Sequence, residues 1–209
     1  RIIAMRIHRM TSILAEGIKS FGILVENEYY FDTLTILSGQ NSRKFYEKAL
    51  AKGINLRKIG GNKLGITLDE TTTAEDIQIL WEVFSESNDL PSIKEIDSDF
   101  TSGEKYTGIP QKLIRNSDFL THPVFRLYQS ETAMLRYLRK LQDKDIALDK
   151  SMIPLGSCTM KLNATSEMIP ISWPEFSNIH PFAPVGQTEG YMKLISDLEN
   201  YLIKITGFD

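Results

Sequence analysis

The sequence predicts an α+β fold made of two unlike parts, and three observations lead to this prediction. Residues 1–88 alternate helical periodicity with short β-branched runs, in the order helix, strand, helix, hairpin, helix. Seven of the eight prolines follow residue 109, and proline interrupts both helices and sheets, so residues 107–209 are expected to be extended and helical. Between these parts, residues 89–106 are acidic and rich in Ser and Asp, which is typical of a linker.

The first helix and the first strand are indicated by their hydrophobic spacing. Apolar residues recur on one helical face from Ile7 to Phe21, and Gly22 provides a stop signal. The run FDTLTIL, Phe31 to Leu37, is aromatic, β-branched and alternating, as strands are. The chain is therefore expected to begin with a helix that is followed by a strand.

A second helix and a hairpin follow. Asn41 or Ser42 is suited to cap a helix that ends at Gly53. The strands INLRKI and KLGITLD flank the turn GGN, Gly60 to Asn62, where glycine adopts positive φ at little cost.

The remaining helices are indicated by caps and apolar stripes. Thr72 and Glu75 have the spacing of a capping box, and the stripe behind them includes Trp81. In the second part, Ser130 is suited to cap a helix with apolar residues from 134 to 141. A last helix is expected over residues 187–205, ending before Gly207.

The composition of the chain argues against several kinds of partner and site. The net charge of −3 argues against nucleic acid or an anionic membrane surface as a partner. A single cysteine excludes an internal disulfide and favours a reducing compartment. The histidines His8, His122 and His180 have no metal-ligand spacing.

The most unusual stretch is GSCT, which places the single cysteine, Cys158, among small residues. A nucleophilic thiol needs a nearby base, and no histidine lies within twenty residues on either side, so a close-packed loop is favoured over a cysteine-dependent enzyme. Ser157 and Thr159 could be catalytic, but such residues more often form local hydrogen bonds. Lys161 could bind an anion or form a Schiff base, but most lysines are solvated at the surface. His180 precedes a proline and either makes a structural contact or faces a ligand.

Several short segments occur together in a specific order. The second part contains GIP at 108, FLTHPVF at 119, SET at 130, MIPLGSCTMKLN at 152, HPF at 180 and GY at 190, and the first contains RIH at 6, FDTL at 31 and LGITLDE at 64. Together they resemble the glycine dehydrogenase (decarboxylating) family, the P-proteins of the glycine cleavage system. One departure is FRLYQSET, with Arg126 and Gln129 where many members have Asn and His.

The resemblance implies a pyridoxal 5'-phosphate enzyme of fold type I, which decarboxylates glycine and passes the aminomethyl group to the lipoyl arm of the H-protein. Members have two homologous halves, so residues 1–88 would be the small C-terminal subdomain of the first half. Residues 107–209 would lead into the second, cofactor-binding half. The Schiff-base lysine region is absent here, so no cofactor is expected on this chain alone. A homo-oligomer is expected, either cytoplasmic in a bacterium or mitochondrial in a eukaryote.

The same resemblance implies that the small-residue loop borders the active site of the intact enzyme. The expected lining residues are Gly156, Ser157, Cys158, Thr159, Lys161, Asn163 and His180. Glycine allows close backbone approach, and hydroxyl and amide groups can hold a carboxylate. The alternative is that the chain is an interaction module between halves or subunits, without chemistry of its own.

Overall fold

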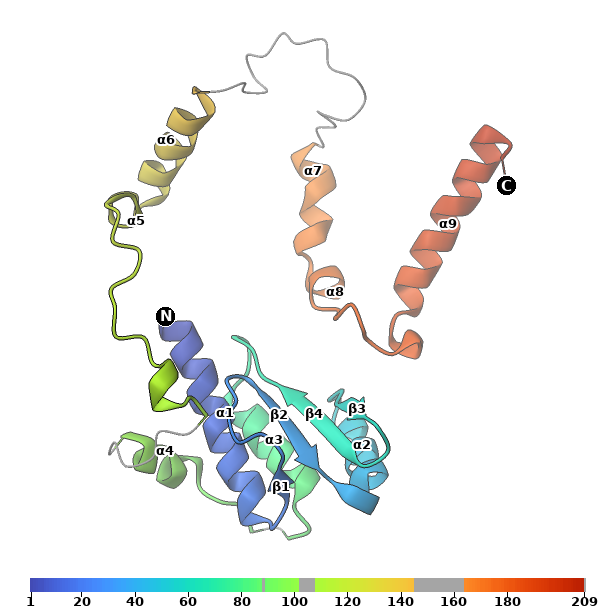
Figure 1. The fold of residues 1–209 in the computed structure, drawn as a ribbon. Helices are drawn as coiled ribbons and strands as arrows, with labels where there is room; N and C mark the ends of the chain where they lie inside the picture. The colour runs from blue at the N-terminus through green and yellow to red at the C-terminus, as the bar shows by residue number, and fades with distance from the viewer. Residues whose placement is uncertain (88, 102–107, 145–163, 209) are drawn as a thin grey trace. The chain divides into compact units, whose positions relative to one another are not determined.

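The computed structural model describes residues 1–87, 89–101, 108–144 and 164–208. The chain divides into two compact units, unit 1 (Arg1–Asn116) and unit 2 (Ser117–Asp209). Figure 1 shows their elements, and each unit is described by itself. The division of the chain at residues 88 and 107 that the sequence suggested stays a prediction.

Unit 1 contains a four-stranded antiparallel sheet in the order β1-β2-β4-β3. Its strands are β1 (Leu24–Val25), β2 (Thr33–Leu37), β3 (Arg57–Ile59) and β4 (Lys63–Thr67). The predicted strand and hairpin are confirmed, with Ile59 opposite Lys63 and Gly60 at a φ of +61° in the turn. Strand β1 was not predicted, since two residues are too short for a recognisable alternation.

Burial alternates along the two central strands. Leu34 and Ile36 of β2 are fully buried and pair with Ile66 and Leu64 of β4, whereas Thr33 is exposed. One face of the sheet is therefore apolar and needs a cover.

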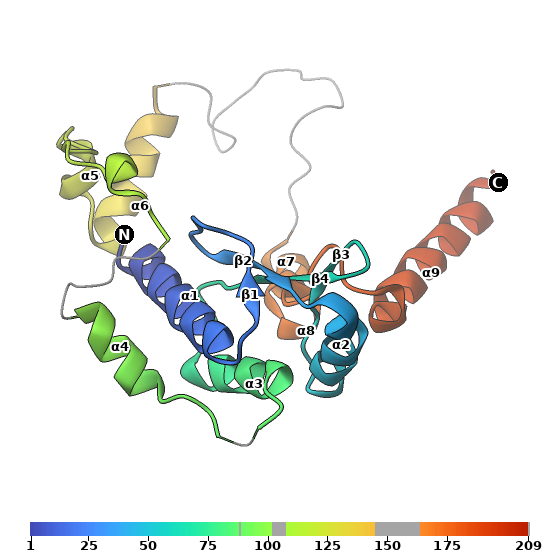
Figure 2. The ribbon, with the colours of Figure 1, turned by 60° about the horizontal axis from the view of Figure 1, so that its bottom comes forward.

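Three helices supply this cover, on one side of the sheet (Figure 2). They are α1 (Ile2–Ser20), α2 (Ser42–Ala51) and α3 (Ala74–Phe84). The three predicted helices are thus confirmed, α1 with an earlier start. The largest core side chain is Trp81 of α3, which is fully buried and donates its indole N–H to the carbonyl of Leu14 at 3.2 Å.

The helix ends differ from the prediction at two caps. The capping box of α3 is Thr73 with Asp76, not Thr72 with Glu75. The run of three threonines fits both registers, and the Thr72 hydroxyl is used instead by the amide of Asp69 at 3.1 Å. Asn41 takes the N-cap position of α2 without a side-chain capping bond, because a 3₁₀ turn, η1 (Gly39–Asn41), precedes the helix.

The predicted linker at residues 89–106 contains a helix, α4 (Ile93–Thr101), which contacts α1. Ile93 and Ile96 pack half-buried against the core, and Arg9 of α1 forms an ion pair with Asp97. Low apolar content suggested a linker, but two isoleucines three residues apart are enough to bind a short helix to an existing core. A 3₁₀ turn, η2 (Gln111–Leu113), follows.

Unit 2 consists of helices and turns in its described residues. These are α5 (Val124–Leu127), α6 (Glu131–Gln142), α7 (Thr165–Met168), η3 (Ile169–Ser172), α8 (Pro174–Ser177), η4 (Val185–Gln187) and α9 (Glu189–Thr206). The predicted caps are confirmed: Ser130 accepts the amide of Ala133 at 3.2 Å, and Gly207 ends α9 at a φ of +72°.

Unit 2 differs from unit 1 in burial. None of its described residues is buried, and the apolar faces of α6 and α9 are exposed. The members of these faces are Met134, Leu135, Leu138 and Leu141 on α6, and Leu194, Ile195, Leu198, Tyr201, Leu202 and Ile205 on α9. Among the described helices of the chain, none has both the length and the apolar character needed to cross a membrane.

Candidate functional site

Most of the residues expected to line an active site lie outside the described residues. These are Gly156, Ser157, Cys158, Thr159, Lys161 and Asn163. Their predicted role stays a prediction.

His180 lies in the described part of unit 2, in a local turn. Its Nδ1 accepts the amide N–H of Phe182 at 3.0 Å, and the two rings lie 5.8 Å apart. His122 does the same with the amide of Val124 at 3.1 Å. In both His-Pro segments the proline has no N–H, so the imidazole caps the next amide along. The predicted role of His180 in lining an active site stays a prediction, and the contact seen here is the local one through Nδ1.

The family-like segments of unit 1 meet at one end of the two central strands, β2 and β4. Arg6, on the first turns of α1, donates to the backbone carbonyls of Glu70 and Thr72. The amide of Leu68 donates to the carbonyl of Asp32 at 3.0 Å, which joins the end of β4 to the start of β2. The segments RIH, FDTL and LGITLDE are thus far apart in sequence but are joined here by hydrogen bonds.

His8 lies at this end of the sheet, next to the start of β2. Its Nδ1 lies 2.9 Å from the carbonyl oxygen of Phe31, and the imidazole stacks on the Phe31 ring at 5.2 Å between centroids and 12° between planes. A carbonyl oxygen only accepts, so Nδ1 carries the proton. His8 is buried, and this contact satisfies the polar atom that burial removes from water.

The GIP segment, which begins at Gly108, packs against His8 and the residues before β2. The carbonyl of Gly108 accepts the amide N–H of Tyr30 at 2.8 Å, and the Gly108 backbone lies against the His8 ring. The Tyr30 ring centroid is 6.1 Å from that of His8, and its buried hydroxyl has no hydrogen-bond partner among the described residues. We call His8, Tyr30, Phe31 and Gly108 the His8 cluster.

At the same end of the sheet, the turn after β4 contains the carboxylate of Asp69. The Thr71 hydroxyl and amide donate to the Asp69 carboxylate at 2.6 and 2.8 Å. The Thr71 hydroxyl, and then its amide, lower the pKa of Asp69 below its ordinary value of 3.8. These hydrogen bonds stabilise the charged form of Asp69. They also fix the conformation of the turn whose carbonyls accept hydrogen bonds from Arg6.

The turn predicts a pH dependence of stability. A carboxylate whose pKa is lower in the folded state contributes stability above its unfolded pKa and loses it as the pH falls through the folded value. Replacing Asp69 with asparagine should therefore flatten the melting-temperature curve between about pH 2 and pH 5, by a small amount because the group is largely exposed. Thermal melts of both proteins across this range check it. Identical curves for the two proteins would contradict it.

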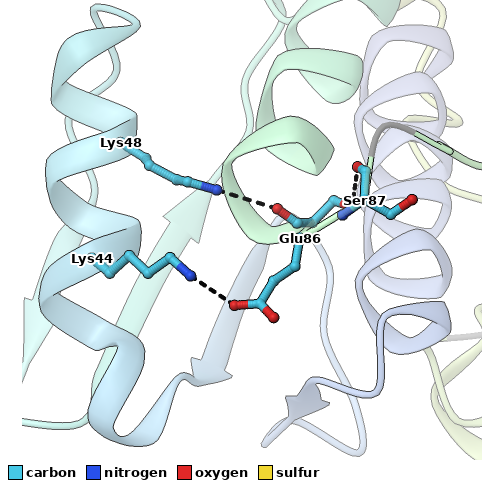
Figure 3. A network of polar contacts seen from close by, with 5 residues as sticks. Lys44, Lys48, Glu86 and Ser87 are labelled. Carbon is cyan, nitrogen blue, oxygen red and sulfur yellow. Dashed lines mark hydrogen bonds and ion pairs between the residues drawn. The ribbon is translucent and has the colours of Figure 1, made fainter.

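A second polar site lies between α2 and the end of α3 (Figure 3). Lys44 pairs with Glu86 at 2.7 Å, Lys48 donates to the carbonyl of Ser85 at 3.2 Å, and Lys52 pairs with Glu82. Lys44 also lowers the pKa of the Glu86 carboxyl. Lys48, Lys52, Glu82 and Glu86 line an open groove of about 460 Å³, and Lys44 lies outside its lining.

This groove does not fit a phosphate-bearing cofactor. Its two lysines, Lys48 and Lys52, already have a carbonyl and a carboxylate partner, and the glutamates facing the groove would repel an anion. The lysine row therefore joins α2 to α3. Within the described ranges, no cluster of His, Cys, Asp and Glu is arranged to hold a metal ion.

Sequence reasoning missed Arg6, His8 and Gly108 as interacting residues. The motifs RIH and GIP were noticed only as parts of a resemblance. Buried His8 beside a positive-φ glycine is recognisable only once the fold brings residues 8, 31 and 108 together.

Known proteins resemble the sequence of this chain along its whole length. The family model for the glycine cleavage system P-protein matches residues 1–84. The glycine dehydrogenase (decarboxylating) of Cupriavidus metallidurans is 52% identical over 99% of the chain, and that of Vibrio parahaemolyticus is 51% identical over 100%. The protein of the same name from Gluconobacter oxydans is 49% identical over 100%.

The chain spans about a fifth of the length of these relatives, 21% or 22% of each. The match extends through both units, including the residues outside the described ranges. Because about half of its residues are identical from end to end, this chain belongs to the glycine dehydrogenase (decarboxylating) family.

Proposed function

We propose that this chain works as a segment of an enzyme that decarboxylates glycine and transfers the aminomethyl group to the lipoyl arm of the H-protein. The observation that carries the proposal is about 50% identity, over 99–100% of the chain, to relatives named glycine dehydrogenase (decarboxylating). The relatives come from bacteria, which favours the cytoplasmic alternative for this chain.

Pyridoxal 5'-phosphate would supply the electron sink for the decarboxylation in the longer enzyme. The groove between α2 and α3 does not fit that cofactor, because its two lysines are paired. The chain alone should therefore catalyse no exchange of bicarbonate with glycine, whereas the full-length enzyme with H-protein should. Visible absorbance from cofactor bound to the isolated chain, lost on Lys161→Ala, would contradict this part of the proposal.

In the full-length enzyme, the loop from Gly156 to Asn163 is proposed to border the substrate. Gly156 would allow close backbone approach, while Ser157, Thr159 and Asn163 would hold the glycine carboxylate and exclude water from it. Lys161 would add positive charge, and Cys158 would pack as a small side chain. His180 would meet the same channel through Nε2.

The loop gives a direct mutational test. In the full-length enzyme, Ser157→Ala and Thr159→Val should each reduce kcat/KM for glycine about ten- to a hundredfold, since one lost hydrogen bond to a charged group costs about 1.5–3 kcal/mol. The melting temperature should change little. Steady-state exchange kinetics and thermal melts measure the two effects. Equal losses of stability and activity would assign these residues a structural role instead.

A second proposed role is that of an interaction module for another half or subunit of the same enzyme. The observation favouring it is the exposed apolar faces of α6 and α9. On α9 the apolar residues form a broad stripe along one face, a width typical of helices that pack on a domain core rather than in a two-stranded coiled coil. The partner would therefore present a broad apolar surface.

A further inference from the structure

The chain between α8 and α9 folds back on itself, and one tyrosine joins its two ends. Tyr191, in the first turn of α9, donates its hydroxyl to the backbone carbonyl of Phe176 in α8 at 2.7 Å. The rings of the two residues also meet edge-on, with centroids 5.8 Å apart and planes at 77°. Because these residues lie 15 positions apart, the chain between them forms a loop with its ends in contact, as in an Ω-loop.

The shape of this loop is set by its own contacts. The amide of Ala183 donates to the carbonyl of His180 at 2.9 Å, and the hydroxyl of Thr188 donates to the carbonyl of Val185 at 3.0 Å. Four residues of the loop are half-buried, and its other residues are exposed. The half-buried residues are Phe176, Ala183, Thr188 and Tyr191.

His180 lies on the exposed part of the loop. Its carbonyl accepts the amide N–H of Ala183, and its Nδ1 accepts that of Phe182 at 3.0 Å. The next residue, Pro181, has its φ fixed by its ring. Both the backbone and the imidazole of His180 therefore depend on the loop keeping its shape, and the Tyr191 hydroxyl closes that loop.

We propose that Tyr191 is a positioning residue for His180, which it holds in a fixed orientation by closing the loop at Phe176. This rests on the proposed function, in which His180 meets the glycine channel. Tyr191 touches no reacting atom in this proposal and acts only through the loop. The two family-like motifs then work together, since HPF supplies the histidine and GY supplies the tyrosine that holds its loop.

The test compares Tyr191→Phe, His180→Ala and the double variant in the full-length enzyme with H-protein. Tyr191→Phe removes only the hydroxyl, so kcat/KM for glycine should fall about two- to tenfold, the effect of one net hydrogen bond. His180→Ala should lower it further. The double variant should be no less active than His180→Ala, because Tyr191 acts only through this histidine. A tyrosine with a merely structural role would add its own loss.

A second readout follows the loop itself, independently of turnover. In Tyr191→Phe, amide hydrogen exchange at Ala183 should rise about threefold or more. Exchange at Met134 in α6, whose amide donates to the carbonyl of Ser130, should stay unchanged. Tyr137→Phe is the matched control, because it removes one hydroxyl from a half-buried, ring-stacked tyrosine of the same unit. This control should change neither exchange at Ala183 nor kcat/KM.

Two results would overturn the positioning role of Tyr191. They are additive losses of kcat/KM in the double variant, and unchanged exchange at Ala183 in Tyr191→Phe. A His180→Ala enzyme with wild-type turnover would instead contradict the role of His180 in the proposed function. The Ala183 amide would then still show whether Tyr191 closes the loop.

Discussion

Replacing Gly17 with alanine is expected to destabilise unit 1 by about 2–4 kcal/mol, although alanine is the better helix former by about 1 kcal/mol. The reason is the indole of Trp81, which lies directly on α1. A Cβ at Gly17 would lie 2.1 Å from Cε2 and 2.2 Å from Nε1 of this fully buried ring. Moving the ring would also break its hydrogen bond to the carbonyl of Leu14.

Urea unfolding of Gly17→Ala, compared with Gly190→Ala, measures this effect. Gly190 lies in α9, and a Cβ added there would have no atom within 4 Å, so alanine should be tolerated. Combining Gly17→Ala with Trp81→Phe should cost less than the sum of the single changes, because phenylalanine lacks the indole ring fused at the clash. A Gly17→Ala protein as stable as the wild type would contradict the described packing.

Replacing one leucine in each unit tests the difference in burial between the two units. Leu14→Ala should lower the free energy of unfolding by about 2–5 kcal/mol, since Leu14 is completely buried and its removal leaves a cavity. Leu198→Ala should change the same quantity by less than about 0.5 kcal/mol, since Leu198 is 53% exposed. The difference follows from burial alone, because the two substitutions are chemically identical.

The measurement can isolate unit 1 by fluorescence. The chain has two tryptophans, the fully buried Trp81 of unit 1 and the half-exposed Trp173 of unit 2, so Trp173→Phe leaves a single reporter. Urea titrations of both leucine variants in this background give the two free energies. A loss of several kcal/mol in Leu198→Ala would show that α9 is part of the same cooperative core, contrary to the expectation.

Local signals predicted the elements of unit 1 well. The periodicity of α1, the glycine turn between β3 and β4, and the stripe of α3 each depend on neighbouring residues. Errors occurred where two local solutions had similar strength. The threonine run allowed two capping registers, and α4 has only two isoleucines to indicate that it packs on α1. Strand β1 forms only because Leu37 and Ile36 are already in place to pair with it.

The candidate sites likewise divide into those that local sequence motifs indicate and those that only the packed structure reveals. Family-specific motifs identified the loop from Gly156 to Asn163, but its geometry lies outside the described residues. His8 and Gly108 received no role from the sequence, because one hundred positions separate them along the chain.

Taken by itself, the amino-acid sequence determined the helices α1, α2, α3, α6 and α9, the hairpin and the family, since these depend on residue spacing and on short motifs. Tertiary structure alone decided that Arg6 donates a hydrogen bond to the carbonyl of Glu70, that Trp81 requires glycine at position 17, and that Gly108 packs against His8. The physical reason is that such contacts depend on distances of a few ångströms between segments far apart in sequence. Only the packed sheet and helices set these distances.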